Sequence, residues 1–140
     1  MIISKITLYL VRMPLRAHFE TSFGRITTRD CLIVEAEAGG IQGYGECVAD
    51  RDPGYSYETS STAWHILNDF IAPAILHKNL ESAVGLQHEL DFIRGHLRAK
   101  SAIEMAFWDL TGKQQGKPLQ ELIGGARPAV PVGVSVGLQD

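Results

Sequence analysis

The sequence predicts an α+β fold, with a three-stranded antiparallel meander followed by a helical bundle. Alternating apolar and polar side chains, the two-residue period of a strand, occur within the first 47 residues. Apolar side chains at three- and four-residue spacing, the period of a helix, then extend to about residue 123. A valine-rich segment over residues 131–138 comes last. Because the strands precede the helices instead of alternating with them, we expect the sheet and the helices to be segregated.

Composition indicates one ordinary globular domain. The 140 residues are 45% hydrophobic and 21% charged, values that exclude a disordered chain. The formal net charge of −3 provides no basic surface for nucleic acid or an anionic membrane. We find neither an apolar run of about 18 residues nor the features of a signal peptide, and we expect a cytoplasmic protein. Cys31 and Cys47 are then expected to be buried free thiols.

The first predicted strand covers residues 5–10, where polar and apolar side chains alternate. We expect Pro14 to end this strand. Residues 18–25 are polar, include a glycine and show no helical period, so we predict a loop there.

The second and third predicted strands form a hairpin. Residues 31–34 are an apolar, largely β-branched run, and Gly39 and Gly40 can form a tight turn. Residues 41–47 alternate again as a third strand. Its glycines indicate either a close approach of another backbone or a bulge.

The first predicted helix follows a turn-rich loop. Ser56 is the expected N-cap, with Glu58 favourably placed against the helix dipole. The apolar stripe runs to Ile71, and Pro73 is expected to end or kink the helix.

Two further helices and a short turn complete the predicted bundle. Ser82 is the expected N-cap of the second helix, which Gly95 interrupts. The third is the clearest helix, from Ala99 to about Gly116, and residues 118–123 add one short turn.

The valine-rich segment 131–138 has two possible places. It either joins the small sheet as a fourth strand or is the first strand of a second domain. About 80 residues of mostly helical sequence separate it from the meander, and this separation favours the second domain.

We assign no catalytic and no metal-ligating residue to this chain. The motif His88-Glu89 has Phe92 where a zinc protease requires a second histidine, so that motif fails. Isolated carboxylates near the predicted elements are expected to be caps, ion-pair partners or supporting groups: Asp30, Glu46, Glu104 and Asp109.

A resemblance covers almost the whole chain. Residues 102–125, AIEMAFWDLTGKQQGKPLQELIGG, closely resemble the end of the capping domain in the muconate-lactonising subgroup of the enolase superfamily. Residues 21–24 resemble the mobile substrate loop of that subgroup, and residues 43–47 resemble its Gly-x-Gly-Glu strand.

Within the subgroup, the chain is most similar to the o-succinylbenzoate synthase and N-acylamino acid racemase branch. The similarity lies in residues 53–58, 71–76 and 133–139. It implies an enolase N-terminal-type capping domain over residues 1–127. Residues 128–140 would then begin a (β/α) barrel, with the terminal strand as the first strand of a truncated barrel.

The resemblance implies removal of a proton α to a carboxylate, with a lysine as base and Mg²⁺ stabilising the enediolate. In the family, a Lys-x-Lys strand and three barrel carboxylates supply these groups. This chain contains no Lys-x-Lys, so we expect it to be inactive alone. The implied partners are a small carboxylate substrate, the chain's own barrel and further copies of itself. A dipeptide epimerase, a muconate cycloisomerase-type enzyme and a stand-alone binding module remain alternatives.

The implied substrate contacts come from the two capping-domain loops and the first barrel strand. Phe19 and Phe23 would provide apolar walls, while Thr21, Ser22 and Arg25 would provide donors, with Arg25 facing a distal carboxylate such as succinyl. Tyr55 would pack against the substrate side chain. The remaining contact would be a hydrogen bond from Ser135.

Overall fold

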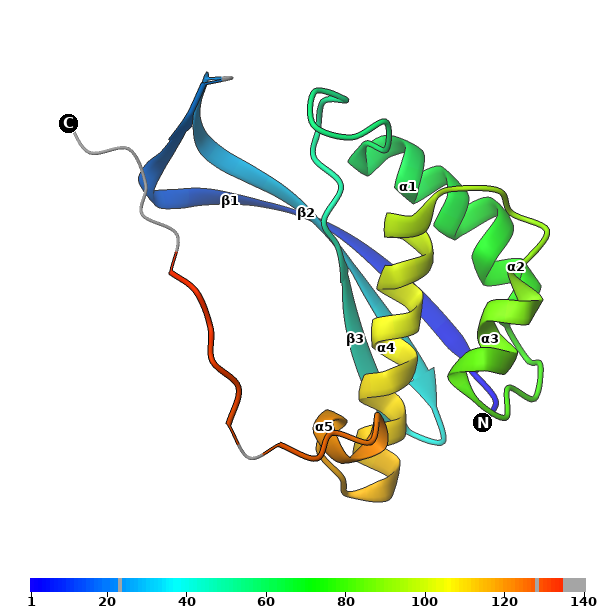
Figure 1. Ribbon diagram of the computed structural model, residues 1–140. Coiled ribbons are helices and arrows are strands. Elements are labelled where there is room, and N and C mark those ends of the chain that lie inside the picture. The colour runs from blue at the N-terminus through cyan, green and yellow to red at the C-terminus, as the bar shows by residue number, and fades with distance from the viewer. Residues whose placement is uncertain (23, 128, 135–140) are drawn as a thin grey trace.

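The computed structural model describes residues 1–22, 24–127 and 129–134. Three antiparallel strands in the order β1-β2-β3 form the sheet, and the helices follow them in the chain (Figure 1). This arrangement confirms the predicted α+β fold and its meander. The bounds of the strands are β1 Lys5–Thr21, β2 Gly24–Ala38 and β3 Ile41–Cys47. The helical elements are α1 Ser60–Ile66, η1 Leu67–Ile71, α2 Ala72–Ile75, α3 Ala83–Glu89, α4 Leu97–Gln115 and α5 Leu119–Leu122.

The hairpin of β1 and β2 is much longer than the sequence predicts. β1 passes through Pro14, which pairs with Thr28, and the pairing resumes after a register shift at Phe19 and Ile26. Pro14 has no amide hydrogen to donate, but it does not end the strand because β1 lies at the edge of the sheet. An edge strand has a neighbour on one side alone, so it can include a residue that donates no hydrogen bond. The loop predicted over residues 18–25 is therefore wrong: residues 18–21 belong to β1 and residues 24–25 to β2, at the outer end of the hairpin.

Helix α4 packs closely against β3 and β2. A Cβ atom added to Gly45 would lie 2.8 Å from the Ala106 amide nitrogen, and one added to Gly43 would lie 2.6 Å from Leu110 Cγ. These distances confirm the predicted close approach of another backbone to the glycines of the third strand. The core lies between the sheet and the helices; its largest fully buried side chains are Ile3, Leu32, Val34, Cys47, Leu67, Ile71, Ile75, Leu86, Ile103 and Leu110.

Helix α1 begins later than predicted. Its N-cap is Thr59 and not Ser56: the Thr62 amide donates to Thr59 Oγ1 at 3.2 Å, and the Thr59 amide donates to Thr62 Oγ1 at 2.9 Å. This reciprocal pair satisfies two backbone donors at once. Helical turns then continue through Pro73 to Ile75, so the proline does not end the helix.

Two other predicted helix ends are confirmed, the start of α3 and the end of α4. Ser82 accepts a hydrogen bond from the Gly85 amide at 3.1 Å as the N-cap of α3. Gly116 takes the left-handed conformation after α4, with φ 62°, which glycine adopts at little cost. The second predicted helix is shorter than expected, because α3 already ends at Glu89. Turn residues follow, and Gly95 and His96, both with positive φ, come directly before α4.

Residues 129–134 follow α5 and form no strand (Figure 1). Val130, Val132 and Val134 are 66%, 85% and 87% exposed. The predicted strand over 131–138 is thus not formed in its described part, since a strand requires a hydrogen-bonded neighbour and these residues pair with none of the described strands. Ser135 lies outside the described residues.

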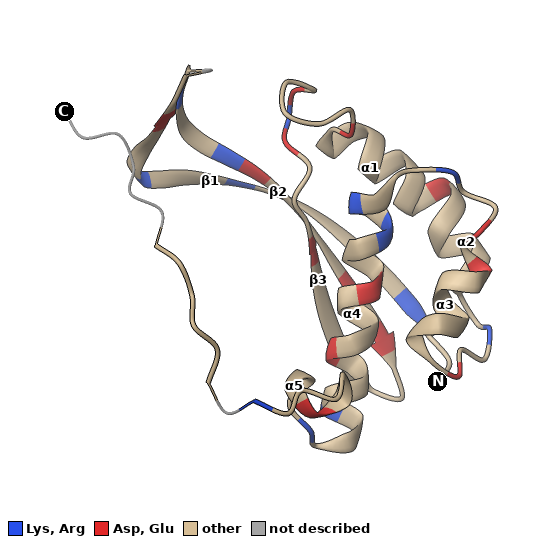
Figure 2. Ribbon diagram, in the orientation of Figure 1, with Lys and Arg blue, Asp and Glu red and all other residues tan. Residues whose placement is uncertain are grey.

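Both cysteines are buried and free, as predicted. Burial raises the pKa of the Cys31 and Cys47 thiols. Among the described residues, no helix has the length and apolar character needed to cross a membrane. Figure 2 shows acidic and basic segments interspersed along the hairpin and the helices.

Candidate functional site

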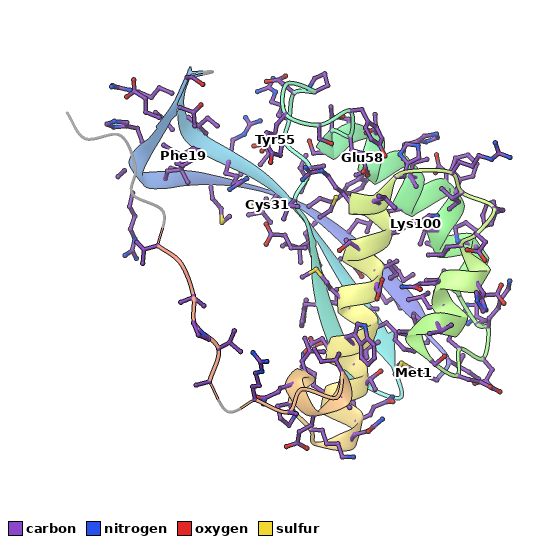
Figure 3. The ribbon with its side chains drawn as sticks, in the orientation of Figure 1. Met1, Phe19, Cys31, Tyr55, Glu58 and Lys100 are labelled. Atoms are coloured by element: carbon purple, nitrogen blue, oxygen red, sulfur yellow. The ribbon has the colours of Figure 1, made fainter. Side chains whose placement is uncertain are left out.

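The two segments predicted to contact a substrate lie toward the same end of the domain. One is the outer hairpin, residues 18–22 and 24–25, and the other is the loop of residues 48–59 between β3 and α1. Figure 3 shows Phe19 and Tyr55 on these segments, far from the labelled Met1. An ion pair connects the loop to the hairpin strand β2, with Arg29 Nη2 at 3.7 Å from Asp50 Oδ1.

The outer hairpin presents one aromatic ring and a paired arginine. Phe19 is 59% exposed. The Arg25 guanidinium binds Glu20, with Nη2 and Nε at 2.7 and 3.0 Å from the same carboxylate oxygen. A substrate carboxylate at Arg25 would therefore compete with Glu20. Thr21 Oγ1 donates to the Gly24 carbonyl at 3.5 Å. Ser22 is exposed, and Phe23 lies outside the described residues.

Tyr55 projects from the loop of residues 48–59. Its side chain is 83% exposed, so a ligand arriving at this end of the domain can reach the ring. The Arg98 guanidinium carbon lies 5.8 Å from the ring centroid, within the range of a cation–π contact. The same guanidinium donates through Nε to Ser56 Oγ at 3.2 Å and through Nη1 to the Val48 carbonyl at 2.9 Å.

Glu58 has a role that the sequence interpretation misplaced. Its buried side chain, 2% exposed, caps α4 and not α1. The Arg98 amide donates to the two carboxylate oxygens at 3.0 and 3.2 Å, and the Ala99 amide donates at 3.2 Å. His96, at the N-cap position, has φ 50° and makes no side-chain capping bond. A carboxylate from 40 residues earlier thus satisfies the first amides of α4.

Three of the four isolated carboxylates have structural roles of the predicted kinds. Asp30 binds Arg12, with Nε 2.7 Å from Oδ1, and this hydrogen bond lowers the pKa of the Asp30 carboxyl. Asp109 accepts the Tyr44 amide at 2.8 Å and the Lys113 ammonium at 2.6 Å. Glu104 accepts hydrogen bonds from Gln87 and Trp108.

Nothing in the described ranges forms a site for a divalent cation. No three His, Cys, Asp or Glu side chains of residues 1–22, 24–127 and 129–134 converge so as to hold a metal. The donor set that Mg²⁺ requires is therefore not provided by these residues. Two surface hollows of about 440 and 480 Å³ lie along α4 and α5, away from the two loops; residues lining them include Trp108, Gly112, Lys113, Gln115, Lys117 and Leu119.

Comparison with known families agrees with this architecture. The profile of the mandelate racemase/muconate lactonizing enzyme N-terminal domain matches residues 4–124. The chain belongs to this family. The predicted relationship to the enolase superfamily is thereby confirmed.

Two relatives carry the names expected from the sequence. This chain is 41% identical over 130 residues to the o-succinylbenzoate synthase of Geobacillus kaustophilus, covering 92% of this chain and 35% of the relative. It is 41% identical over 132 residues to the N-succinylamino acid racemase of Thermus thermophilus, covering 94% and 36%. The chain thus spans about a third of the length of these curated relatives.

Solved structures of the superfamily share the fold. An enolase superfamily member from Listeria innocua has a TM-score of 0.90 at 34% identity, covering 99% of this chain and 38% of that one. A dipeptide epimerase from Cytophaga hutchinsonii, solved with Mg and the dipeptide D-Ala-L-Val, has a TM-score of 0.81 at 29% identity, covering 92% and 35%.

Proposed function

We propose that this chain is the capping domain of an enzyme that removes a proton from the carbon α to a carboxylate. Within that class we propose an o-succinylbenzoate synthase, an N-acylamino acid racemase, or one enzyme with both activities. The observation that carries this proposal is the 41% identity, over nearly all of this chain, to relatives with each of these two names. Both reactions begin with the same proton abstraction, so one capping domain suits both.

We also propose that residues 1–127 are the capping domain and that residues 128–140 begin a barrel domain. Support comes from residues 129–134, which leave α5 without pairing to β3. A stand-alone binding module that used this segment to complete its own sheet would pair it there. The proposed partners are the barrel, a small carboxylate substrate and further copies of the chain. A cytoplasmic location is proposed from the two free thiols.

In this proposal the residues of this chain supply specificity and not chemistry. The outer hairpin and the loop of residues 48–59 close over the substrate and exclude water, which strengthens electrostatic interactions at the reacting carbon. Phe19 and Phe23 provide apolar walls, and Tyr55 packs on the side chain of the substrate. The polar contacts come from Thr21, Ser22, Arg25 and Ser135. Since the described residues form no Mg²⁺ site, any metal would be bound by residues of the barrel.

The test is to express the complete reading frame that contains this chain and, separately, the 140-residue chain. We expect the complete protein to dehydrate a succinyl-cyclohexadiene carboxylate or to exchange the α-proton of an N-succinylamino acid for deuterium. The 140-residue chain should do neither, because it contains no Lys-x-Lys base strand. Turnover by the short chain, or exchange by the complete protein on dipeptides alone, would contradict the proposal.

A further inference from the structure

We propose that Arg98 is a positioning residue that fixes the loop of residues 48–59, and with it Tyr55, before a substrate binds. The inference rests on the proposed function for its enzymatic consequence, but its structural basis does not. Arg98 occupies the first turn of α4, about 40 residues after the loop that it contacts. Arg98 as a whole residue is half-buried.

The guanidinium of Arg98 binds both ends of the loop. Nη1 reaches the carbonyl of Val48, the first loop residue, at 2.9 Å, and Nε reaches Ser56 Oγ, near the last, at 3.2 Å. Its cationic carbon lies 5.8 Å from the Tyr55 ring between these points. One side chain thus restrains the start of the loop, its end and the residue proposed to contact the substrate.

Glu58 holds Arg98 in place through the backbone. The carboxylate accepts the amides of Arg98 and Ala99, so the last part of the loop is bound to the backbone of the helix that carries the guanidinium. The loop is also closed at its base, where the Ser60 amide donates to the Asp50 carbonyl at 2.8 Å. The contacts of the guanidinium therefore set the conformation of the loop, while other bonds anchor its base.

An arginine suits this task better than a lysine. Its planar fork directs separate N–H groups at two acceptors and stacks on an aromatic ring, whereas one ammonium is a compact point charge on a flexible stem. Because a preset loop loses less conformational entropy when a ligand binds, fixing Tyr55 should favour substrate binding. The chemical step, proposed to occur in the barrel, should be little affected.

The first experiment measures hydrogen exchange on the 140-residue chain with Arg98→Ala and Arg98→Lys. We expect the amides at the end of the loop that have hydrogen-bond acceptors, those of Glu58, Thr59 and Ser60, to exchange about tenfold faster in both variants, with the centre of α4 unchanged. Arg94→Ala, at an exposed arginine four residues earlier, is the matched control and should exchange as the parent does. Exchange in the loop that is unchanged in both Arg98 variants would overturn the proposal.

The second experiment measures steady-state kinetics of the complete protein on an N-succinylamino acid. Arg98→Lys should raise KM by about tenfold and leave kcat within about twofold. A fall in kcat at constant KM would contradict a positioning role. If the unmodified complete protein shows no turnover, the proposed function fails, whereas the exchange measurement still decides whether Arg98 fixes the loop.

Discussion

Glu58 stabilises the start of α4 although it precedes α1 in the chain. A helix has amides at its start without partners inside the helix, and burial without such partners is costly. The residue before α4 is His96, in the left-handed conformation and without a side-chain bond to the helix. The buried Glu58 carboxylate supplies the acceptors that a serine or aspartate at this position would otherwise provide.

Glu58→Ala should lower the free energy of unfolding by about 1–3 kcal/mol, because it leaves the buried α4 amides without an acceptor. Glu58→Gln should cost less, since its amide oxygen can still accept a hydrogen bond. Urea unfolding of the 140-residue chain measures both effects. Glu81→Ala, at an exposed position, serves as the control and should change stability by less than about 0.5 kcal/mol. A loss no greater than that of the control would contradict the capping role.

The Arg12–Asp30 pair gives the stability of the hairpin a dependence on pH. The hydrogen bond from Arg12 lowers the pKa of Asp30 below its ordinary value of 3.8. The folded state therefore favours the carboxylate. The stabilisation is present above about pH 4 and is lost as the pH falls through the lowered pKa.

Asp30→Asn should accordingly melt at a lower temperature than the parent chain at pH 6. The difference should shrink as the pH is lowered below about 4, where the parent aspartate becomes protonated as well. Thermal unfolding at several pH values measures this. A difference in melting temperature that stays constant down to pH 2 would show that the charge of Asp30 does not contribute.

At the scale of the elements, the contact between β3 and α4 depends on the absence of side chains. Gly43 and Gly45 bring the strand backbone against the helix backbone at Ala102 and Ala106. This close contact explains why β3 has glycine at these two positions, although β-branched residues are usually favoured in strands.

Gly45→Ala should destabilise the domain by about 1–3 kcal/mol, since the added methyl group would meet backbone atoms that cannot move independently. Gly54→Ala is the matched control, because no atom lies within 4 Å of the added carbon. Calorimetry of both variants tests the prediction. Equal melting temperatures for the two variants would show that α4 shifts freely away from β3.

The same scale shows which predictions from sequence succeed. The periods of the strands and helices predicted the order of the elements, and Ser82 and Gly116 were correctly placed at helix ends because these ends depend on local chemistry. The hairpin end and the cap at Glu58 were not predicted. The cap at Glu58 depends on a contact between distant residues, because its carboxylate reaches a helix 40 residues later. The hairpin end depends on pairing of residues 19–21 with 24–26, which the polar, glycine-containing sequence there does not indicate.

For the whole molecule, the family could be predicted from the sequence only when a resemblance to known sequences was added to the residue patterns. Periodicity alone described an α+β domain without chemistry, and the motif over residues 102–125 pointed to the family that the comparison confirmed. The candidate site was predicted less completely. Tyr55 and Phe19 lie toward one end of the domain (Figure 3), and their contacts with a substrate stay predictions. Arg98 was not predicted, because its contacts with residues about 40 positions earlier leave no signal in the sequence around it.

The outer half of the hairpin extends beyond the helices, and its side chains are exposed on both faces. Two strands without a covering layer are at best marginally stable in water. Local stability should therefore form a gradient along one continuous ribbon, from Leu32 and Val34, which are fully buried, to the tip near Thr21. The same two strands thus form a rigid base beside the helices and an outer arm that becomes more ordered when another molecule or domain packs against it.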